Sequence, residues 1–255
     1  MKKEICWNIT ARCNQNCKYC HRFQNIKDLK FEENLLILNK LKNANINSIT
    51  WTGGEALILE EIDGLLKISH ENKINNKLIT NGKLLTKNRI DKIYKYLDSI
   101  TLSIDSIDDE INNTLGRGIN HFQEIKEILD SIHEKKYNVK VRINSVICKN
   151  NLETINKLVD FLNEYNIYSW RLFKFMPLRE KAIINKNIFD ITLDEYNNVI
   201  FYIKNNSNIR KIDTRVEEDM EKKYILILAN GDIIKTESGK DKKIGVSVKS
   251  FVVKS

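Results

Sequence analysis

Hydrophobic and polar residues follow two different periodicities along the first 175 residues of this chain. Short apolar runs rich in β-branched residues predict strands, whereas longer segments with apolar residues at i, i+3 and i+4 predict amphipathic helices. The runs that predict strands are EICWNIT (4–10), INSITW (46–51), KLIT (77–80), SITLSID (99–105), VKVRINSVI (139–147) and SWRLFKF (169–175). The segments that predict helices are 31–44, 59–73, 86–97, 121–136 and 151–166. Strands and helices therefore alternate through six βα-like units.

Repeated βα units favour one parallel sheet with right-handed crossovers and helices outside it. Eight units would close a complete barrel, so six predict a partial, TIM-like (βα)6 barrel of the α/β class. The pattern changes after the single proline, Pro177, where a further helix and a hairpin with its turn at Asn230-Gly231 are predicted. We therefore expect a barrel core over residues 1–177 and a C-terminal α+β extension over 178–255 that covers the barrel mouth or edge.

Length and charge narrow the class of protein only slightly. No apolar run approaches the roughly 20 residues that cross a bilayer, and strand-like sequence begins almost at the first residue, so we expect a cytoplasmic protein without a signal peptide. The net charge of +8 would suit a polyanionic partner. Lysines alternate with acids along the helical segments, however, so most of this charge is expected to be solvated. A specific anion site must come from a few well-placed residues.

Three of the five cysteines lie within TARCNQNCKYCHRF, in the spacing C-x3-C-x2-C: Cys13, Cys17 and Cys20. They follow the first predicted strand, at the strand end where parallel α/β folds bind ligands. Clustered cysteines in a reducing compartment bind metal or carry out redox chemistry, and thiolates suit iron–sulfur clusters and zinc. A cubane cluster with three cysteine ligands has one iron open to a substrate or cofactor. A zinc site completed by His21 is the alternative, although Cys20 and His21 are adjacent and the usual paired C-x2-C arrangement is missing.

Polar motifs also follow the later predicted strands. Gly53-Gly54-Glu55 follows the second strand, where glycines allow close approach of backbone to a ligand and a carboxylate can bind an ammonium group. Further polar residues end the third, fourth and fifth strands: Asn81, Ser103, Asp105 and Asn144.

The cysteine spacing, with Tyr19 directly before Cys20, resembles that of the radical S-adenosylmethionine (SAM) superfamily, and the later motifs follow in the expected order. This resemblance implies one [4Fe–4S] cluster on Cys13, Cys17 and Cys20. It implies that SAM is chelated by the open iron and cleaved by an electron from the cluster, giving a 5'-deoxyadenosyl radical that abstracts hydrogen from a substrate. A flavodoxin or ferredoxin would be the reductant. The implied SAM-binding residues are Gly53, Gly54, Glu55, Asn81, Ser103, Asp105, Arg117 and Asn144.

The stretches DSIDDEINNTLGRG, VRINSVI and WRLFKF, within residues 5 to 175, are similar to the viperin family. Viperins are antiviral enzymes that dehydrate a nucleoside triphosphate to its 3'-deoxy-3',4'-didehydro analogue, so the resemblance implies a lyase acting on CTP, UTP or GTP. A triphosphate requires converging cations. The candidates are Arg142, which stands where the family pattern has lysine, Arg171, Lys174 and Lys240. Arg117 is a further candidate, with binding of the SAM carboxylate as its alternative role. The sequence shows no counterpart of the amphipathic helix of animal viperins, so no membrane attachment is expected.

Two other functions are compatible with parts of the sequence. A radical SAM enzyme that modifies a peptide or another metabolite would share the same core, but many such enzymes have a cysteine-rich extension, and this chain has no cysteine after Cys148. A zinc-stabilised basic module that binds nucleic acid would account for the charge and the cysteines. That second alternative leaves the Gly-Gly-Glu motif unexplained. We therefore expect a monomer with a nucleoside triphosphate substrate and no stable complex with nucleic acid.

Overall fold

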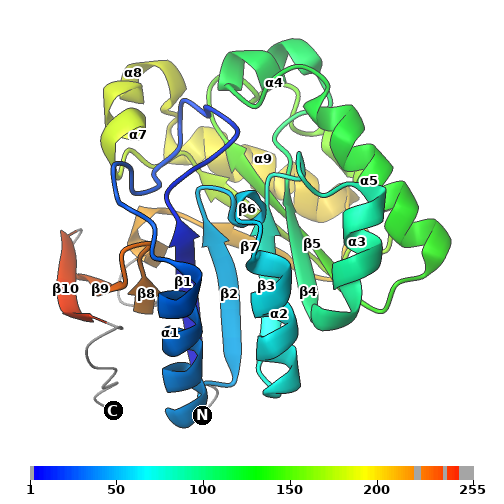
Figure 1. The fold of residues 1–255 in the computed structure, drawn as a ribbon. Helices are drawn as coiled ribbons and strands as arrows, with labels where there is room; N and C mark the ends of the chain where they lie inside the picture. The colour runs from blue at the N-terminus through cyan, green and yellow to red at the C-terminus, as the bar shows by residue number, and fades with distance from the viewer. Residues whose placement is uncertain (1–2, 221–224, 238–239, 247–255) are drawn as a thin grey trace.

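The computed structural model describes residues 3–220, 225–237 and 240–246. These residues form one ten-stranded sheet with the order β10-β9-β8-β1-β2-β3-β4-β5-β6-β7 (Figure 1). The strands are β1 (Glu4–Thr10), β2 (Ser48–Gly53), β3 (Asn75–Thr80), β4 (Ser99–Ser103), β5 (Lys140–Ile147), β6 (Ser169–Lys174), β7 (Ile212–Arg215), β8 (Ile225–Ile227), β9 (Asp232–Glu237) and β10 (Lys240–Val246).

All neighbouring strands from β8 through β1 to β7 are parallel, and β8, β9 and β10 pair antiparallel. Helices connect the parallel strands, and most of them cover the outer side of the sheet (Figure 1). They are α1 (Phe31–Asn43), α2 (Ile62–Glu71), α3 (Lys87–Ile93), α4 (Asp109–Leu115), α5 (His121–Lys135), α6 (Lys157–Asn163), α7 (Glu180–Ile184), α8 (Lys186–Phe189) and α9 (Leu193–Asn206), with short 3-10 turns at Ala56–Ile58, Tyr94–Tyr96 and Glu217–Met220. The predicted α/β partial barrel is confirmed, because β7 and β10 are separate edges and the sheet does not close.

Three local features differ from the prediction. β7 is a seventh parallel strand, and its sequence, IDTR, has neither the length nor the apolar pattern that would reveal it. The helix predicted over 151–166 is shorter, because α6 begins only after a series of turns. The unpredicted helix α4 begins after Asp108, whose carboxylate accepts hydrogen bonds from two backbone N–H groups of the first turn.

The hairpin predicted at Asn230-Gly231 is confirmed and joins β8 to β9. Gly231 N donates to Leu228 O at 2.8 Å, and Leu228 N donates to Asp232 O at 2.8 Å. β8 lies beside β1, whereas β7 lies beyond β6, so the C-terminal part of the chain adds strands to both sides of the parallel core (Figure 1).

The two faces of the sheet differ in polarity. In β5, Val141, Ile143 and Ile147 are buried under the helices, while Arg142 and Asn144 alternate with them on the other face. The same alternation runs through β1 to β6, so one face packs into the main hydrophobic core. The opposite face is largely polar, and it forms the inner wall of the partial barrel.

Candidate active site

A cavity of about 750 Å³ lies against the polar face of the sheet, with walls from β1 to β7 and from the cysteine loop, defined here as residues 11–23. Most of the predicted site residues line it: Cys13, Cys17, Cys20, Gly53, Gly54, Glu55, Asn81, Ser103, Arg117, Arg142, Asn144, Arg171 and Lys174. Asp105 is fully buried behind this wall and does not line the cavity. The side chain of Lys240 lies outside the described residues. The fold therefore brings together positions that are spread over more than half of the sequence.

The cysteine loop has an inner and an outer side, because its residues alternate in burial. Cys13, Gln15, Cys17 and Tyr19 point inward, whereas the residues between them are exposed. Every second side chain from residue 13 to residue 19 therefore lies on the same side of the loop. The spacing C-x3-C thus directs two thiols into the cavity, with Gln15 between them.

Glycines allow the cysteine loop to pack against the end of β2. Gly54 N donates to Thr10 O at 2.7 Å, and Glu55 N donates to Arg12 O at 2.8 Å. A Cβ atom on Gly54 would lie only 2.0 Å from Arg12 O, and one on Gly53 would lie 2.3 Å from Thr10 O. The sequence interpretation linked these glycines to a ligand, whereas the structure shows that the backbone of the cysteine loop already requires them.

A third glycine serves the other side of the loop. Asn16 N donates to Gly116 O at 3.1 Å, and Lys18 N donates to Leu115 O at 2.9 Å. Gly116 has a φ of +85°, and a Cβ atom there would lie 2.3 Å from Asn16 O. The loop is therefore held between the end of β2 and the end of α4.

Glu55 is buried, and backbone and side-chain donors hold its carboxylate. It accepts hydrogen bonds from Leu57 N at 3.1 Å, Thr80 Oγ1 at 2.8 Å and Asn81 N at 2.7 Å. Burial raises the pKa of Glu55, while these hydrogen bonds act in the opposite direction. Asn81 continues this wall toward the cysteine loop, because its Nδ2 donates to Asn14 Oδ1 at 2.8 Å.

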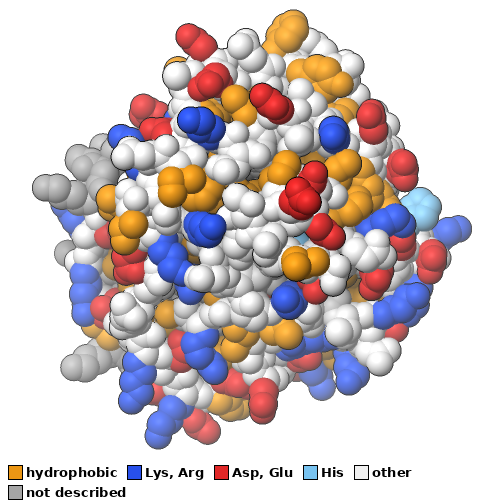
Figure 2. Space-filling view, turned by 90° about the horizontal axis from the view of Figure 1, so that it is seen from above, with side chains coloured by type: hydrophobic (Ala, Val, Ile, Leu, Met, Phe, Trp, Pro, Cys, Tyr) orange, Lys and Arg blue, Asp and Glu red, His pale blue; other side chains and the backbone are white. Residues whose placement is uncertain are grey.

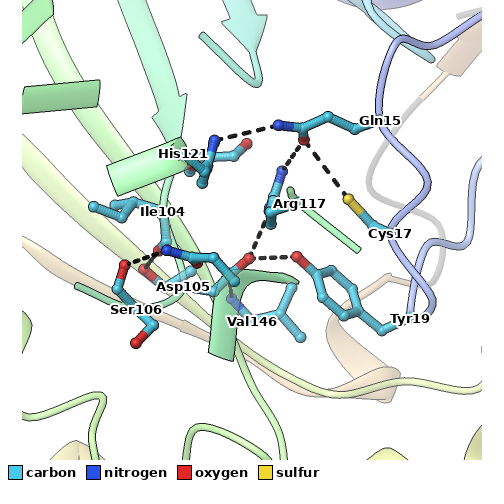
Figure 3. A network of polar contacts seen from close by, with 12 residues as sticks. Gln15, Cys17, Tyr19, Ile104, Asp105, Ser106, Arg117, His121 and Val146 are labelled. Atoms are coloured by element: carbon cyan, nitrogen blue, oxygen red, sulfur yellow. Dashed lines mark hydrogen bonds and ion pairs between the residues drawn. The ribbon is translucent and has the colours of Figure 1, made fainter. Parts of the chain in front are cut away.

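A buried ion pair supports the cavity wall next to Cys17 (Figure 3). Arg117 Nε donates to Asp105 Oδ2 at 2.7 Å, and the Tyr19 hydroxyl donates to the same oxygen. Val146 N donates to Asp105 Oδ1 at 2.8 Å, so both carboxylate oxygens have partners. Asp105 therefore holds Arg117 and Tyr19 in place from behind the wall, rather than facing a ligand directly.

Gln15 and His121 extend this network to the cysteine loop (Figure 3). His121 Nε2 lies 2.9 Å from Ser103 O, so this nitrogen carries the proton and Nδ1 accepts from Gln15 Nε2 at 3.2 Å. This arrangement turns Gln15 Oε1 toward Arg117 Nη1, at 3.2 Å, and toward the Cys17 thiol. Burial lowers the pKa of His121 to about 4, so the imidazole is neutral at pH 7. Sequence reasoning missed both residues, because their roles depend on contacts between distant segments.

The three loop cysteines fit an iron–sulfur cluster better than a single metal ion. Burial raises the pKa of Cys13, and it raises the pKa of Cys17 to about 11, so these thiols lose their protons only to a strong positive centre such as a metal. Within the described residues, no three His, Cys, Asp or Glu side chains converge on one point where a single ion could be held. In a cubane cluster each cysteine binds a different iron, so convergence on one point is not required. The geometry therefore disfavours the zinc alternative.

The predicted substrate cations differ in their partners. Arg171 Nε lies 2.8 Å from Asp213, and Lys174 Nζ lies 3.0 Å from Asp190. Arg142 has no acidic partner among the described residues; its Nε is buried without a hydrogen bond, and its guanidinium group stacks on Tyr168 at 4.9 Å. Among the predicted substrate cations whose side chains the structure describes, Arg142 is therefore the one whose charge is most available to a ligand.

A seventh strand adds a cation to the cavity that the sequence interpretation did not include. Arg215, in β7, lines the cavity and lies 2.5 Å from the Asp213 carboxylate that also binds Arg171. Two arginines thus share one acid at the β6–β7 side of the cavity. Because β7 has no recognisable pattern, the sequence contained no signal for this residue.

Together, the partial barrel and the three cysteines that line its cavity define an enzyme that carries an iron–sulfur cluster at the mouth of a polar cavity. The family model of the radical SAM superfamily matches residues 7–162, and the chain belongs to this superfamily. Radical SAM enzymes use a [4Fe–4S] cluster and SAM, and this chain is a radical SAM enzyme with these cofactors.

Two curated relatives carry nucleotide-related names. The chain is 30% identical to an S-adenosylmethionine-dependent nucleotide dehydratase of Flammeovirga pacifica, over 91% of this chain and 82% of that protein. It is 29% identical to a GTP 3',8-cyclase of Clostridium botulinum, over 71% of this chain and 58% of that protein. The similarity to nucleotide dehydratases confirms the resemblance to viperins, although other dehydratases match over only about half of their length.

Among solved structures, Streptococcus suis SuiB bound to the precursor peptide SuiA superposes with a TM-score of 0.73. The sequence identity is 23%, and the match covers 90% of this chain and 58% of SuiB. This likeness shows a shared fold. Of the helices in the described part of the chain, none combines the length and apolar character of a membrane span.

Proposed function

We propose that this enzyme dehydrates a nucleoside triphosphate to its 3'-deoxy-3',4'-didehydro analogue. In this reaction the 5'-deoxyadenosyl radical would take the hydrogen atom from C4', and the C3' hydroxyl group would leave as water with one proton and one further electron from the reductant. The nucleotide thereby loses the mass of one water. The 30% identity to a nucleotide dehydratase over most of both chains supports the proposal. By the resemblance to viperins, we extend the proposal to a role in antiviral defence.

The observation that carries this proposal is the position of Arg142 in the same cavity as the three cysteines. Arg142 lies on the polar face of β5, with Asn144 two residues later on the same face. Arg142 is half-buried, and its Nε–H is buried without a hydrogen-bond partner, which is unfavourable unless a ligand accepts that hydrogen bond. A triphosphate would supply a counter-charge and could accept the unsatisfied Nε–H.

The remaining cations would complete a triphosphate site. Arg171 and Arg215 share Asp213, so this trio retains one positive charge beside Arg142. Register pairing places Asn144 directly opposite Arg171 on the neighbouring strand. We expect the phosphates to lie against these strands, while Ser103 and Asn144 lie between the phosphates and the cysteine loop.

At the cofactor end of the cavity, the residues of the chain would bind the cluster and orient SAM. A [4Fe–4S] cluster bound by Cys13, Cys17 and Cys20 would supply the electron for reductive cleavage of SAM. Glu55 would accept a hydrogen bond from the SAM ammonium group, and the outer N–H groups of Arg117 would bind the SAM carboxylate. Asp105 fixes the orientation of Arg117 for this role by its hydrogen bond to Nε.

The test is a substrate screen with the reconstituted enzyme under anaerobic conditions. SAM and dithionite are added, CTP, UTP, GTP and ATP are supplied separately, and 5'-deoxyadenosine and nucleotide mass are followed. One triphosphate should stimulate SAM cleavage and give a product lighter by one water. A product of unchanged mass would indicate a rearrangement such as cyclisation, and no change in any nucleotide would reject the proposed substrate.

Arg142→Glu separates substrate binding from SAM cleavage. The reversed charge should repel the triphosphate and reduce dehydration to background, while SAM cleavage without substrate continues at the wild-type rate. Arg142→Lys keeps the charge and should restore a large part of the turnover, with a raised KM because the bidentate geometry is lost. Equal loss of dehydration and of SAM cleavage in Arg142→Glu would instead indicate that Arg142 binds SAM or is needed for folding.

A further inference from the structure

Helices α7 and α8 pack against the cysteine loop. Ala182 in α7 and Phe189 in α8 are buried in a small apolar cluster that also contains Cys17 and Tyr19. Asn185, between the two helices, donates from Nδ2 to Lys18 O at 3.0 Å. These contacts attach the helices directly to the segment that carries the cysteines.

The same two helices expose three isoleucines, named here the isoleucine patch. Ile183, Ile184 and Ile188 are 55%, 80% and 52% exposed. They are not needed to anchor the helices, because Ala182 and Phe189 already do so. Neighbouring exposed apolar side chains on an otherwise charged surface mark a site of protein interaction.

The surface around the isoleucine patch is basic. The cysteine loop contains Arg12, Lys18 and Arg22 and no acidic residue. Lys18 is exposed between Cys17 and Cys20, and Lys186 is exposed on α8. Asp28 offsets Arg12 at 2.8 Å, and the exposed acid of α7 is Glu180, so a positive excess remains. Figure 2 looks onto this end of the molecule, where hydrophobic, basic and acidic side chains are interspersed.

We propose that the isoleucine patch, with Lys18 and Lys186 at its edge, docks the electron donor of this enzyme, a small acidic protein that carries a one-electron centre. The apolar patch provides contact area, and the lysines select an acidic partner by charge complementarity. Each docking event transfers one electron for each SAM cleaved, so the donor is oxidised by one electron and the cysteine-bound cluster is reduced by one. No atom moves between the proteins.

The location of the surface fits this role. Lys18 belongs to the outer side of the loop, whereas its neighbours Cys17 and Tyr19 face the cavity. A donor bound to the outer side would approach the cluster without entering the cavity, so substrate and donor can be bound together. The inference rests on membership of the radical SAM superfamily and holds for any substrate.

The experiment compares two reductants with the reconstituted enzyme and no nucleotide. A flavodoxin reduced to its hydroquinone is the protein probe, and dithionite is the small-molecule reductant. The test variant combines Ile184→Glu with Lys186→Glu. The control variant combines Phe201→Glu with Lys204→Glu on α9. The carboxyl end of α9 is hydrogen-bonded to the end of α6 and so lies near the amino ends of the strands, away from the cysteine loop. The readouts are flavodoxin affinity by calorimetry, the paramagnetic signal of the reduced cluster and 5'-deoxyadenosine formation.

The test variant should raise the Kd for flavodoxin by about tenfold or more, and lower flavodoxin-driven cluster reduction and SAM cleavage by a similar factor. With dithionite, cluster reduction and SAM cleavage by the test variant should remain at wild-type levels. The control variant should match the wild type with either reductant. Wild-type flavodoxin affinity should also fall with rising salt, and the test variant should show a weaker dependence. An unchanged flavodoxin Kd, or equal losses with both reductants, would overturn the proposal. So would a wild-type dimer that the test variant dissociates without affecting flavodoxin binding, since the patch would then join two copies of the chain.

Discussion

Replacing Asp105 with Asn tests whether the buried ion pair supports the cavity wall. Asp105 is fully buried and Arg117 is 9% exposed. Asn is nearly isosteric and can still accept from Val146 N, but its NH2 group would face the donors of Arg117 and Tyr19. The guanidinium group would therefore remain buried without a counter-charge, which costs about 3–5 kcal/mol.

That loss is a large fraction of the free energy of unfolding of a typical domain, which is about 5–15 kcal/mol. With a urea m-value of about 3 kcal/mol/M, it corresponds to a decrease of about 1–1.7 M in the unfolding midpoint. The apoprotein is unfolded under reducing conditions, so that the cluster does not contribute. Tryptophan fluorescence reports the transition, because Trp7, Trp51 and Trp170 are all fully buried.

The charge of Arg117 does not depend on pH in this experiment. Burial lowers the pKa of Arg117, but the Asp105 carboxylate outweighs burial and raises it overall, so the arginine is charged throughout the accessible pH range.

Two comparisons make this experiment specific. Glu71→Gln breaks the exposed pair of Lys67 and Glu71, whose closest atoms lie 3.8 Å apart, and should change stability by no more than about 0.5 kcal/mol. Combining Arg117→Met with Asp105→Asn removes the buried charge together with its partner, and should recover at least about 2 kcal/mol relative to Asp105→Asn alone. A loss below about 1 kcal/mol for Asp105→Asn, or strictly additive effects in the double variant, would refute the reasoning.

Three further predictions concern the cysteine loop and its surroundings. Gly54→Ala should lower both stability and the iron content after reconstitution, because its Cβ would meet the Arg12 carbonyl, whereas Gly64→Ala on α2 has open space and should stabilise by about 0.5–1 kcal/mol; equal iron contents would contradict the role of Gly54. Cys17→Ala should abolish the visible absorption of the cluster together with SAM cleavage, whereas Cys148→Ala should retain both; SAM cleavage by Cys17→Ala would contradict the cluster assignment. His121 has a pKa of about 4 when folded and about 6.5 when unfolded, so the unfolded chain takes up the proton first as pH falls, and stability should decrease between these two values by at most about 3 kcal/mol. Urea midpoints at several pH values should show this decrease in the wild type and a flatter curve in His121→Asn.

The sequence predicted those parts of the fold whose signals are local. Strands β1 to β6 and the hairpin at Asn230-Gly231 were found because apolar runs and turn residues define them without reference to the rest of the chain. β7 was missed because its four residues are all partly exposed and lack an apolar face. The first six residues of the segment 151–166 form turns rather than a helix, which periodicity alone does not show.

In the candidate site, too, the sequence predicted the features with local signals and missed those that depend on contacts between distant segments. The cysteines and the Gly-Gly-Glu motif were predicted because strand ends gather on one side of a parallel sheet. The functions of the glycines and of Asp105 could not be predicted, since both depend on which segment packs against them. Gly54 meets the cysteine loop, and Asp105 turns inward to Arg117 and Tyr19. Gln15 does show a local signal in hindsight, because it occupies the central inward position between Cys13 and Cys17.

The two sides of the cysteine loop face different surroundings, the cavity that holds the cofactors and the surface proposed for electron entry. The inner side presents thiols to the cavity, while the outer side presents Lys18 and Asn16 to solvent. The backbone of this segment packs directly against Gly54 on one side and Gly116 on the other, which fixes its position. Because the exposed Lys18 belongs to the same short segment as Cys17 and Cys20, a donor at the outer surface would come close to the cluster without entering the cavity. A bulky side chain at either glycine would therefore disturb cluster binding, SAM cleavage and electron entry together, whereas changes on the outer side alone should affect only electron entry.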